Sequence, residues 1–141
     1  MAETQVFGGA AQPVDHRSKR SAVKRGFLGK CPNCGEGRLF SGYVSVRDEC
    51  DICHEELHHH RADDFPAYLV IFIIGHTLVP GFLAAYFWLD MGPWAQLALW
   101  VPFTVAATLL LLPRVKGAVI GLQWALRMHG FGGHEDETYE I

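Results

Sequence analysis

Four cysteines form two Cys-x2-Cys pairs, a spacing that brings thiolates to one metal ion. Cys31 pairs with Cys34 and Cys50 with Cys53, and fifteen residues separate the two pairs. Two such pairs at this separation favour a tetrahedral site with four sulfur ligands, the preferred geometry of structural zinc. Because the protein then supplies every ligand, the metal would fold its surroundings and would not bind a substrate. The pattern predicts a zinc ribbon with Zn(II) as the cofactor.

Other interpretations of the four cysteines remain open. They could form a redox-active pair, a transient copper or iron site, or disulfides. A location facing the cytosol favours metal over disulfides, because that compartment keeps thiols reduced. His54 follows the second pair at a position where a glycine often helps the turn, and its imidazole could compete as a ligand.

Histidines beyond the second pair form another group that could bind metal. His58, His59 and His60 lie in an acidic segment that ends at Asp64 and Pro66. Neutral imidazoles next to Glu55, Glu56, Asp63 and Asp64 could carry a transition metal. A metal or haem handling protein is therefore the alternative function. We favour the plainer interpretation of a solvated linker between the zinc ribbon and the following apolar segment.

His76 lies inside that apolar segment, where an ionisable group is costly and requires a partner. Counting back from the turn predicts that it lies level with Thr104 or Thr108 of the returning segment. We expect a neutral imidazole bonded across to one of these hydroxyls. A contact to haem, copper or a quinone is the sharper alternative, and a polar contact to another membrane protein is a further one.

Two long uncharged segments must position these groups. Residues 67–89 and 94–112 carry no formal charge apart from a possible one on His76, and Asp90-Met91-Gly92-Pro93 between them is turn chemistry. Each segment is long enough to cross a hydrocarbon core of roughly 30 Å. The sequence predicts a mainly α membrane protein whose residues 67–112 form a two-helix transmembrane hairpin.

The distribution of cations predicts the orientation of this hairpin. All twelve lysines and arginines lie before residue 62 or after residue 113, and the turn has none. The positive-inside rule then places both termini and the cysteines in the cytoplasm, with Asp90 on the outer side of a multi-pass hairpin.

The remaining segments complete the predicted organisation. Residues 1–30 are expected to be a disordered basic N-terminal segment, and residues 31–66 the N-terminal cytoplasmic zinc ribbon with its acidic, histidine-rich linker. Residues 113–131 are expected to form a C-terminal amphipathic helix at the interface, and residues 132–141 an acidic tail. The predicted apolar face of that helix consists of Val115, Val119, Leu122 and Leu126.

Partners follow from this organisation. The cations close to the membrane favour anionic lipid headgroups over nucleic acid. A two-helix hairpin has too little interior for a transport path, which favours docking on a larger membrane protein complex or a homo-oligomer. The chain lacks a catalytic triad, a P-loop and a GxGxxG motif, and we expect no enzymatic activity.

The run KCPNCGEGRLFSGY, then CDIC, then DDFPAYLVIFIIGH resembles the bacterial domain-of-unknown-function family numbered 983. Two residues depart from the family pattern: His54 replaces a glycine, and Phe65 stands where glycine is common between Asp and Pro. The resemblance implies a small inner-membrane protein without an established activity. Family members are often encoded near cytochrome c oxidase subunits and their assembly factors, which implies a role in respiratory-oxidase assembly by analogy.

Overall fold

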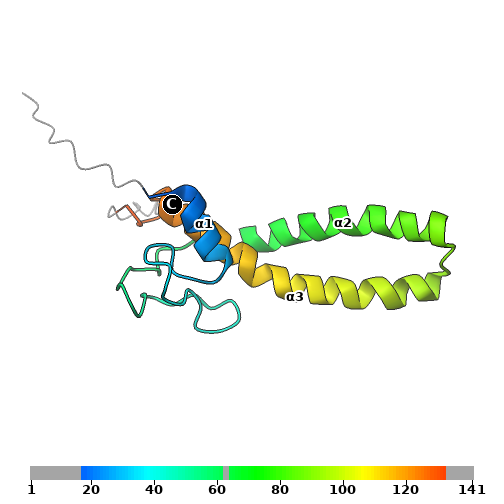
Figure 1. Ribbon diagram of the computed structural model, residues 1–141, viewed down its shortest axis with the longest axis horizontal. Helices are drawn as coiled ribbons and strands as arrows, with labels where there is room; N and C mark the ends of the chain where they lie inside the picture. Colours follow the sequence, from blue (N-terminus) through cyan, green and yellow to red (C-terminus); the bar gives the residue numbers. More distant parts are fainter. Residues whose placement is uncertain (1–16, 62–63, 133–141) are drawn as a thin grey trace, which may run out of the picture.

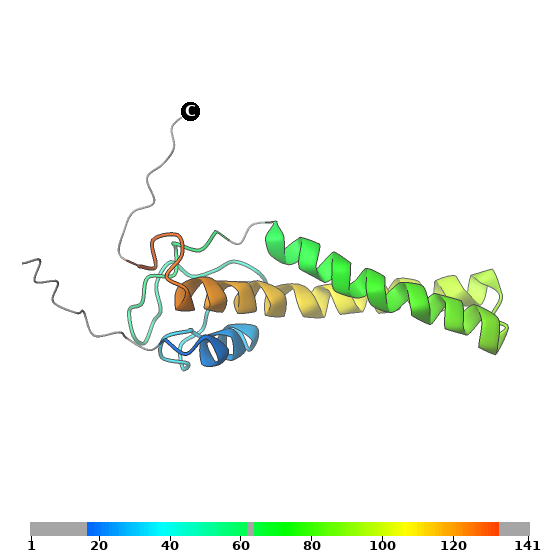
Figure 2. The same ribbon diagram turned by 90° about the horizontal axis from the view of Figure 1, so that it is seen from above.

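The computed structural model describes residues 17–61 and 64–132, and its regular elements are three helices (Figure 1). They are α1 (Lys19–Phe27), α2 (Phe65–Leu89) and α3 (Pro93–Ala125). Helices α2 and α3 lie side by side as an antiparallel hairpin, and α1 lies against the far end of α3 (Figure 2). Between α1 and α2, residues 28–61 form a looped segment that we term the cysteine module.

The hairpin confirms the prediction of two long apolar helices. The 25 residues of α2 give a length of about 37 Å at 1.5 Å per residue, and both helices are long and apolar enough to cross a membrane. The described part of the chain covers little of their apolar surface, because only 11% and 6% of the most apolar windows are buried. A core helix of a soluble protein would be mostly buried.

Polar groups near the turn hold the two helices together. Gln96 is buried, donates from Nε2 to the carbonyl oxygen of Phe82 at 3.4 Å, and accepts from Trp100 Nε1 at 2.7 Å. The indole of Trp100 lies over Gly81, where a Cβ would come within 2.5 Å of the ring. Gly81 therefore permits the close approach of α2 and α3.

The expected hydrogen bond from His76 across the hairpin is not formed. Nδ1 of His76 lies 2.9 Å from the carbonyl oxygen of Phe72 on the same helix, and the imidazole faces outward. Thr104 and Thr108 donate along α3 to the carbonyl oxygens four residues earlier. Each polar side chain is satisfied by its own helix, which a count of residues from the turn cannot detect.

Helix α3 continues where the sequence predicted a break. We expected the second apolar helix to end at residue 112 and a separate amphipathic helix to span residues 113–131, but α3 runs without interruption to Ala125. Pro113 lacks an N–H, so the carbonyl oxygen of Leu109 loses its helical donor. The hydroxyl of Tyr43, from the cysteine module, donates to that oxygen at 2.5 Å. A distant segment thus replaces the missing hydrogen bond.

This replacement predicts a double-mutant cycle. Tyr43→Phe should lower the free energy of unfolding by about 1 kcal/mol, because it leaves the carbonyl of Leu109 without a donor. In a Pro113→Ala background the restored N–H can bond this oxygen, and the same substitution should cost close to nothing. Denaturant unfolding in detergent measures both values. Equal costs in the two backgrounds would contradict this role of Tyr43.

The face of α3 that is buried beyond Pro113 also differs from the predicted one. Val115 and Val119 are buried as expected, but Leu122 and Leu126 are exposed. The buried face instead includes two glycines, Gly117 and Gly121, together with Ile120, Gln123 and Trp124. The prediction was wrong because it counted only large apolar residues, whereas this face makes its closest contacts through residues without a side chain.

Helix α1 packs on these glycines, which corrects the expected disorder of residues 1–30 within the described range. Ala22 and Gly26 of α1 face Gly121 and Gly117 of α3, and a Cβ on either Gly26 or Gly117 would collide with the carbonyl oxygen of the other. Such spacing of small residues four apart lets two backbones come into contact. Residues 1–16 of the predicted basic segment and residues 133–141 of the predicted acidic tail lie outside the described residues.

Candidate metal centre

The cysteine module folds around its sulfur atoms and has little regular structure. Its backbone pairing is limited to isolated antiparallel bridges, Lys30 with Arg38, Phe40 with Val46, and Glu49 with Glu56. The predicted ribbon is therefore made of bridged loops, with no strand in the described part of the chain. Leu39 and Leu57 anchor the loops in the core beside Cys31 and Cys50, and all four of these residues are fully buried.

The four cysteines converge on one point, as their spacing predicted. Their Sγ atoms all lie within 4.8 Å of one another. Cys31 Sγ lies 3.7 Å from Cys53 Sγ, and Cys34 Sγ lies 3.9 Å from Cys50 Sγ. A tetrahedral ion with metal–sulfur bonds of about 2.3 Å requires sulfur atoms roughly 3.8 Å apart. The four side chains fit such an ion, and the cluster is a candidate metal site.

The same distances bear on the disulfide alternative. All four cysteines are free, and the separations of 3.7 and 3.9 Å are far longer than a sulfur–sulfur bond of about 2.05 Å. Both of these sulfur contacts also join one Cys-x2-Cys pair to the other. This arrangement is typical of four ligands around one ion and differs from two local redox pairs.

Two similar turns present the sulfur pairs. The N–H of Gly35 donates to the carbonyl oxygen of Cys31 at 2.9 Å, and the N–H of His54 donates to that of Cys50 at 3.0 Å. Both turns end on a left-handed residue, with φ of 77° at Gly35 and 55° at His54. His54 thus preserves the turn and places a side chain where glycine is preferred.

This conformation predicts that His54→Gly stabilises the cysteine module. Glycine has no Cβ to oppose the left-handed region, so the free energy of unfolding should rise by about 1 kcal/mol. The exposed contact between His54 Nδ1 and Glu49 would be lost at little cost. Chemical denaturation of the metal-loaded protein measures the change. His54→Ala is the matched control, since it also removes the imidazole but keeps the strain, and an equal gain there would contradict the explanation.

Backbone N–H groups and burial shift the pKa values of the thiols in opposite directions. Burial raises the pKa of Cys34, but the N–H groups of Gly37 and Glu36, both 3.4 Å from its sulfur, and the thiols of Cys53 and Cys50 together lower that pKa to about 7. Burial raises the pKa of Cys31 and of Cys53 above the ordinary value. A cation shared by the four sulfurs would offset the cost of burying these thiolates.

Residues outside the cysteines also hold the site, and the sequence did not single them out. A Cβ on Gly37 would collide with Cys50 Sγ, so only glycine fits there. Arg25 of α1 donates to the carbonyl oxygens of Pro32 at 3.1 Å and Asn33 at 2.6 Å, which supports the first turn. The CGxG run signals the tight turn, whereas no local pattern marks Arg25 as a partner of that turn.

Glu55 connects the second turn to the first turn and to α3. Its two carboxylate oxygens accept from Asn33 Nδ2 at 3.0 Å and from Trp124 Nε1 at 2.7 Å. The guanidinium of Arg17 lies 4.3 Å from the centre of the Trp124 ring. Gln123 Nε2 donates to the carbonyl oxygen of Arg61 at 3.0 Å. The cysteine module is thus bound to the end of α3 by buried contacts and by hydrogen bonds.

The predicted histidines separate into two groups. Glu56, His58 and His59 bring one ligand atom each within 4.8 Å of the others. His60 Nδ1 instead lies 2.9 Å from the carbonyl oxygen of Leu57, and His76 lies on α2. The sequence suggested His58–His60 together with nearby carboxylates, and the structure groups His58 and His59 with one of these, Glu56, without His60.

The chain is thus a small, mainly helical protein. Its two long apolar helices could cross a membrane, and its four-cysteine cluster could hold a metal ion. Residues 40–124, more than half of the chain, match the family model described as "Protein of unknown function (DUF983)". The chain belongs to this family. The match includes Cys50 and Cys53 and both apolar helices, and it begins after Cys31 and Cys34. Comparisons with curated proteins and with solved structures found no match.

Proposed function

We propose that this protein is a non-enzymatic membrane adaptor or assembly factor with a structural Zn(II) site. In this proposal α2 and α3 cross the bacterial inner membrane, and both termini and the cysteine module lie in the cytoplasm. The absence of lysine and arginine from the turn supports that orientation. The partner is a larger membrane complex, and the family resemblance favours the respiratory oxidase during its assembly.

The observation that carries the proposal is the continuity of α3 from the hairpin into the core of the cysteine module. Ile120 and Trp124, near its end, share one buried cluster with Cys31 and Cys50. A module fixed to a helix in this way keeps a defined distance and direction from the hairpin. That rigidity suits a protein that aligns a cytoplasmic surface with a partner in the membrane. A closed four-thiolate site suits the same role, since it offers no open position for catalysis.

The outer face of α2 offers a docking surface within the proposed membrane region. An open groove of about 590 Å³ is lined by residues on both sides of a glycine, namely Ile71, Phe72, Gly75, His76, Val79 and Pro80. No atom lies within 4 Å of the position of a Cβ on Gly75, so a neighbouring helix can approach closely there. His76, on this face, would supply a polar contact.

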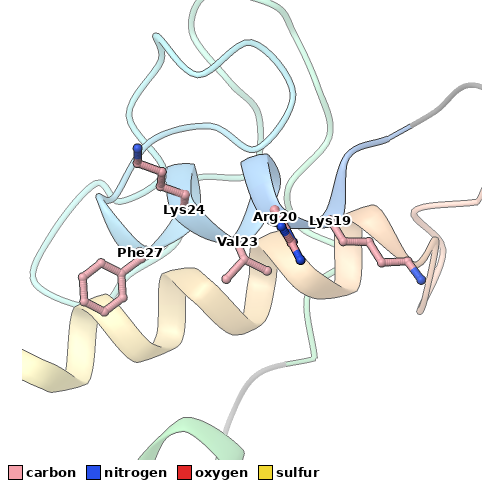
Figure 3. A pocket seen from close by; sticks show the side chains of 5 residues that line it. All are labelled: Lys19, Arg20, Val23, Lys24 and Phe27. Carbon is pink, nitrogen blue, oxygen red and sulfur yellow. The ribbon is translucent and has the colours of Figure 1, made fainter.

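Helix α1 would contact anionic lipid headgroups. Lys19, Arg20 and Lys24 surround Val23 and Phe27 on one face of this helix (Figure 3). Phe27 also borders a second hollow with Pro113 and Arg114, where the uncharged part of α3 ends. Cations next to exposed apolar side chains at that level suit the boundary between headgroups and acyl chains.

Site-specific photo-cross-linking in intact cells tests the adaptor role. A cross-linking amino acid at Val79, which is 58% exposed, should give a covalent adduct with a discrete membrane protein. The control position Ile74, on the same helix but 8% exposed, should give none. An adduct of twice the mass of this chain would identify a homo-oligomer instead. Adducts with lipid alone would contradict docking through this groove, and labelling of the cysteines from the periplasm would contradict the orientation.

Metal handling is the second candidate function, and one observation favours it. The cluster of Glu56, His58 and His59 lies at the surface of the cysteine module, where a metal could enter and leave. A role for His76 in haem or copper binding has less support, because His76 belongs to neither group of candidate metal ligands among the described residues.

A further inference from the structure

We infer that Glu56, His58 and His59 form a second metal site, separate from the four cysteines, that binds a divalent transition metal with an open coordination position. Two imidazoles and one carboxylate suit ions of intermediate softness such as Zn²⁺, Co²⁺, Ni²⁺ and Cu²⁺. The site does not depend on the adaptor role, because it lies on the cysteine module whatever docks on the hairpin.

The ligand atoms already lie near one another. Glu56 Oε2 is 3.0 Å from His59 Nε2, and the ring centres of His58 and His59 are 4.0 Å apart. A tetrahedral ion with bonds of about 2.0–2.1 Å holds its ligand atoms roughly 3.4 Å apart. With all three atoms within 4.8 Å of one another, only small side-chain rotations are required to surround an ion.

The backbone that carries these three residues is anchored. Leu57, between Glu56 and His58, is fully buried, and its N–H donates to the carbonyl oxygen of Asp48 at 2.7 Å. His58 donates from its N–H to the same oxygen at 3.2 Å, and Glu56 is bridged to Glu49. The backbone of these three residues is therefore already ordered, so metal binding would cost little further conformational entropy.

The segment after α3 restrains the imidazole of His59. The ring of Phe131 meets it edge-on with 5.8 Å between the ring centres. Gly130, with φ of 87°, lies so close that a Cβ would come within 2.6 Å of His59 Nδ1. These contacts leave Nε2, on the side of Glu56, as the nitrogen for a metal. His59 is thereby oriented by residues more than seventy positions away in the sequence.

The two sites differ in whether the metal ion would keep a coordination position open to solvent, and this decides how readily the ion exchanges. The four sulfurs close their site, two of them fully buried, whereas three ligands at the surface leave a position for water or an incoming ligand. We expect the cysteine site to retain its metal and the Glu56–His58–His59 site to exchange it. A site of this kind can accept and release an ion without unfolding the cysteine module.

Cobalt titration of the full-length, zinc-loaded protein in detergent, purified without a histidine tag, tests the inference. The wild type should bind one equivalent of Co²⁺ with visible absorption of nitrogen and oxygen ligation, while zinc stays on the cysteines. The double variant His58→Ala/His59→Ala should lose this equivalent and keep the zinc. His60→Ala is the matched control, since it removes a neighbouring imidazole that is not part of the cluster, and it should bind Co²⁺ like the wild type.

A second variant keeps the inference testable if the double variant fails to fold. Glu56→Gln changes one exposed carboxylate and should weaken Co²⁺ binding by at least about tenfold, an effect that substitutions next to metal ligands already reach. No bound Co²⁺ in the wild type would overturn the inference. So would a second equivalent that persists unchanged in both His58→Ala/His59→Ala and Glu56→Gln. Either result leaves the cross-linking test of the adaptor role unaffected.

Discussion

Cys50→Ser is expected to release the metal and unfold the cysteine module. Cys50 Sγ is fully buried, lies 3.9 Å from Cys34 Sγ, and fills the space beside Gly37. Serine removes a soft thiolate from a four-sulfur site, and binding of structural zinc contributes about 10–16 kcal/mol to the folding of small zinc domains. Loss of one ligand should remove enough of this binding free energy to leave residues 28–61 unfolded.

Metal content and proteolysis measure this result. The wild type should hold one tightly bound zinc ion and resist cleavage in residues 28–61, and Cys50→Ser should do neither. Ile52→Ser is the matched control, because Ile52 lies within the same Cys-x2-Cys turn with an exposed side chain. It should keep both the zinc and the resistance. A folded Cys50→Ser module, or a wild type indifferent to strong chelators, would rule out a structural metal.

Gly117→Leu is expected to detach α1 from α3. The backbones of Gly26 and Gly117 are in contact, so a Cβ on Gly117 meets the carbonyl of Gly26 and the rest of a leucine cannot be placed. Overpacking in a core commonly costs about 1–3 kcal/mol, and here the obstacle is backbone that cannot rotate away. The contacts of Arg25 with the first cysteine turn would be lost with α1, and the module should bind its metal more weakly.

Hydrogen exchange of the α1 amides measures the detachment. These amides should be protected in the wild type and exchange rapidly in Gly117→Leu. Gly75→Ala is the matched control, a helical glycine with no atom within 4 Å of its Cβ position. Alanine there should leave α1 protected and stabilise α2 by about 0.5–1 kcal/mol. Unchanged protection of α1 in Gly117→Leu would show that the glycine contact does not hold this helix.

The failed predictions for Pro113 and for the N-terminal basic segment share a cause, which is that the deciding partner is distant in the chain. Pro113 marks the end of a helix by local rules, yet α3 continues through it, and Tyr43, seventy residues earlier, donates to the carbonyl oxygen that Pro113 leaves without its helical donor. The short helix α1 is basic and lacks a strong apolar face, so its sequence resembles a disordered segment. Its packing depends on Ala22 and Gly26, and small residues give no hydrophobic signal.

The sequence alone determined the two apolar helices and the convergence of the four cysteines. Both follow from local chemistry, because the length of an uncharged segment sets what it can span and Cys-x2-Cys spacing sets which thiolates can meet. Only the tertiary structure decided how these parts are joined. It packed α1 on the glycines of α3, tied Glu55 to Trp124, and set Gly130 and Phe131 against His59. Those contacts depend on close packing between segments far apart in the chain, which no local pattern encodes.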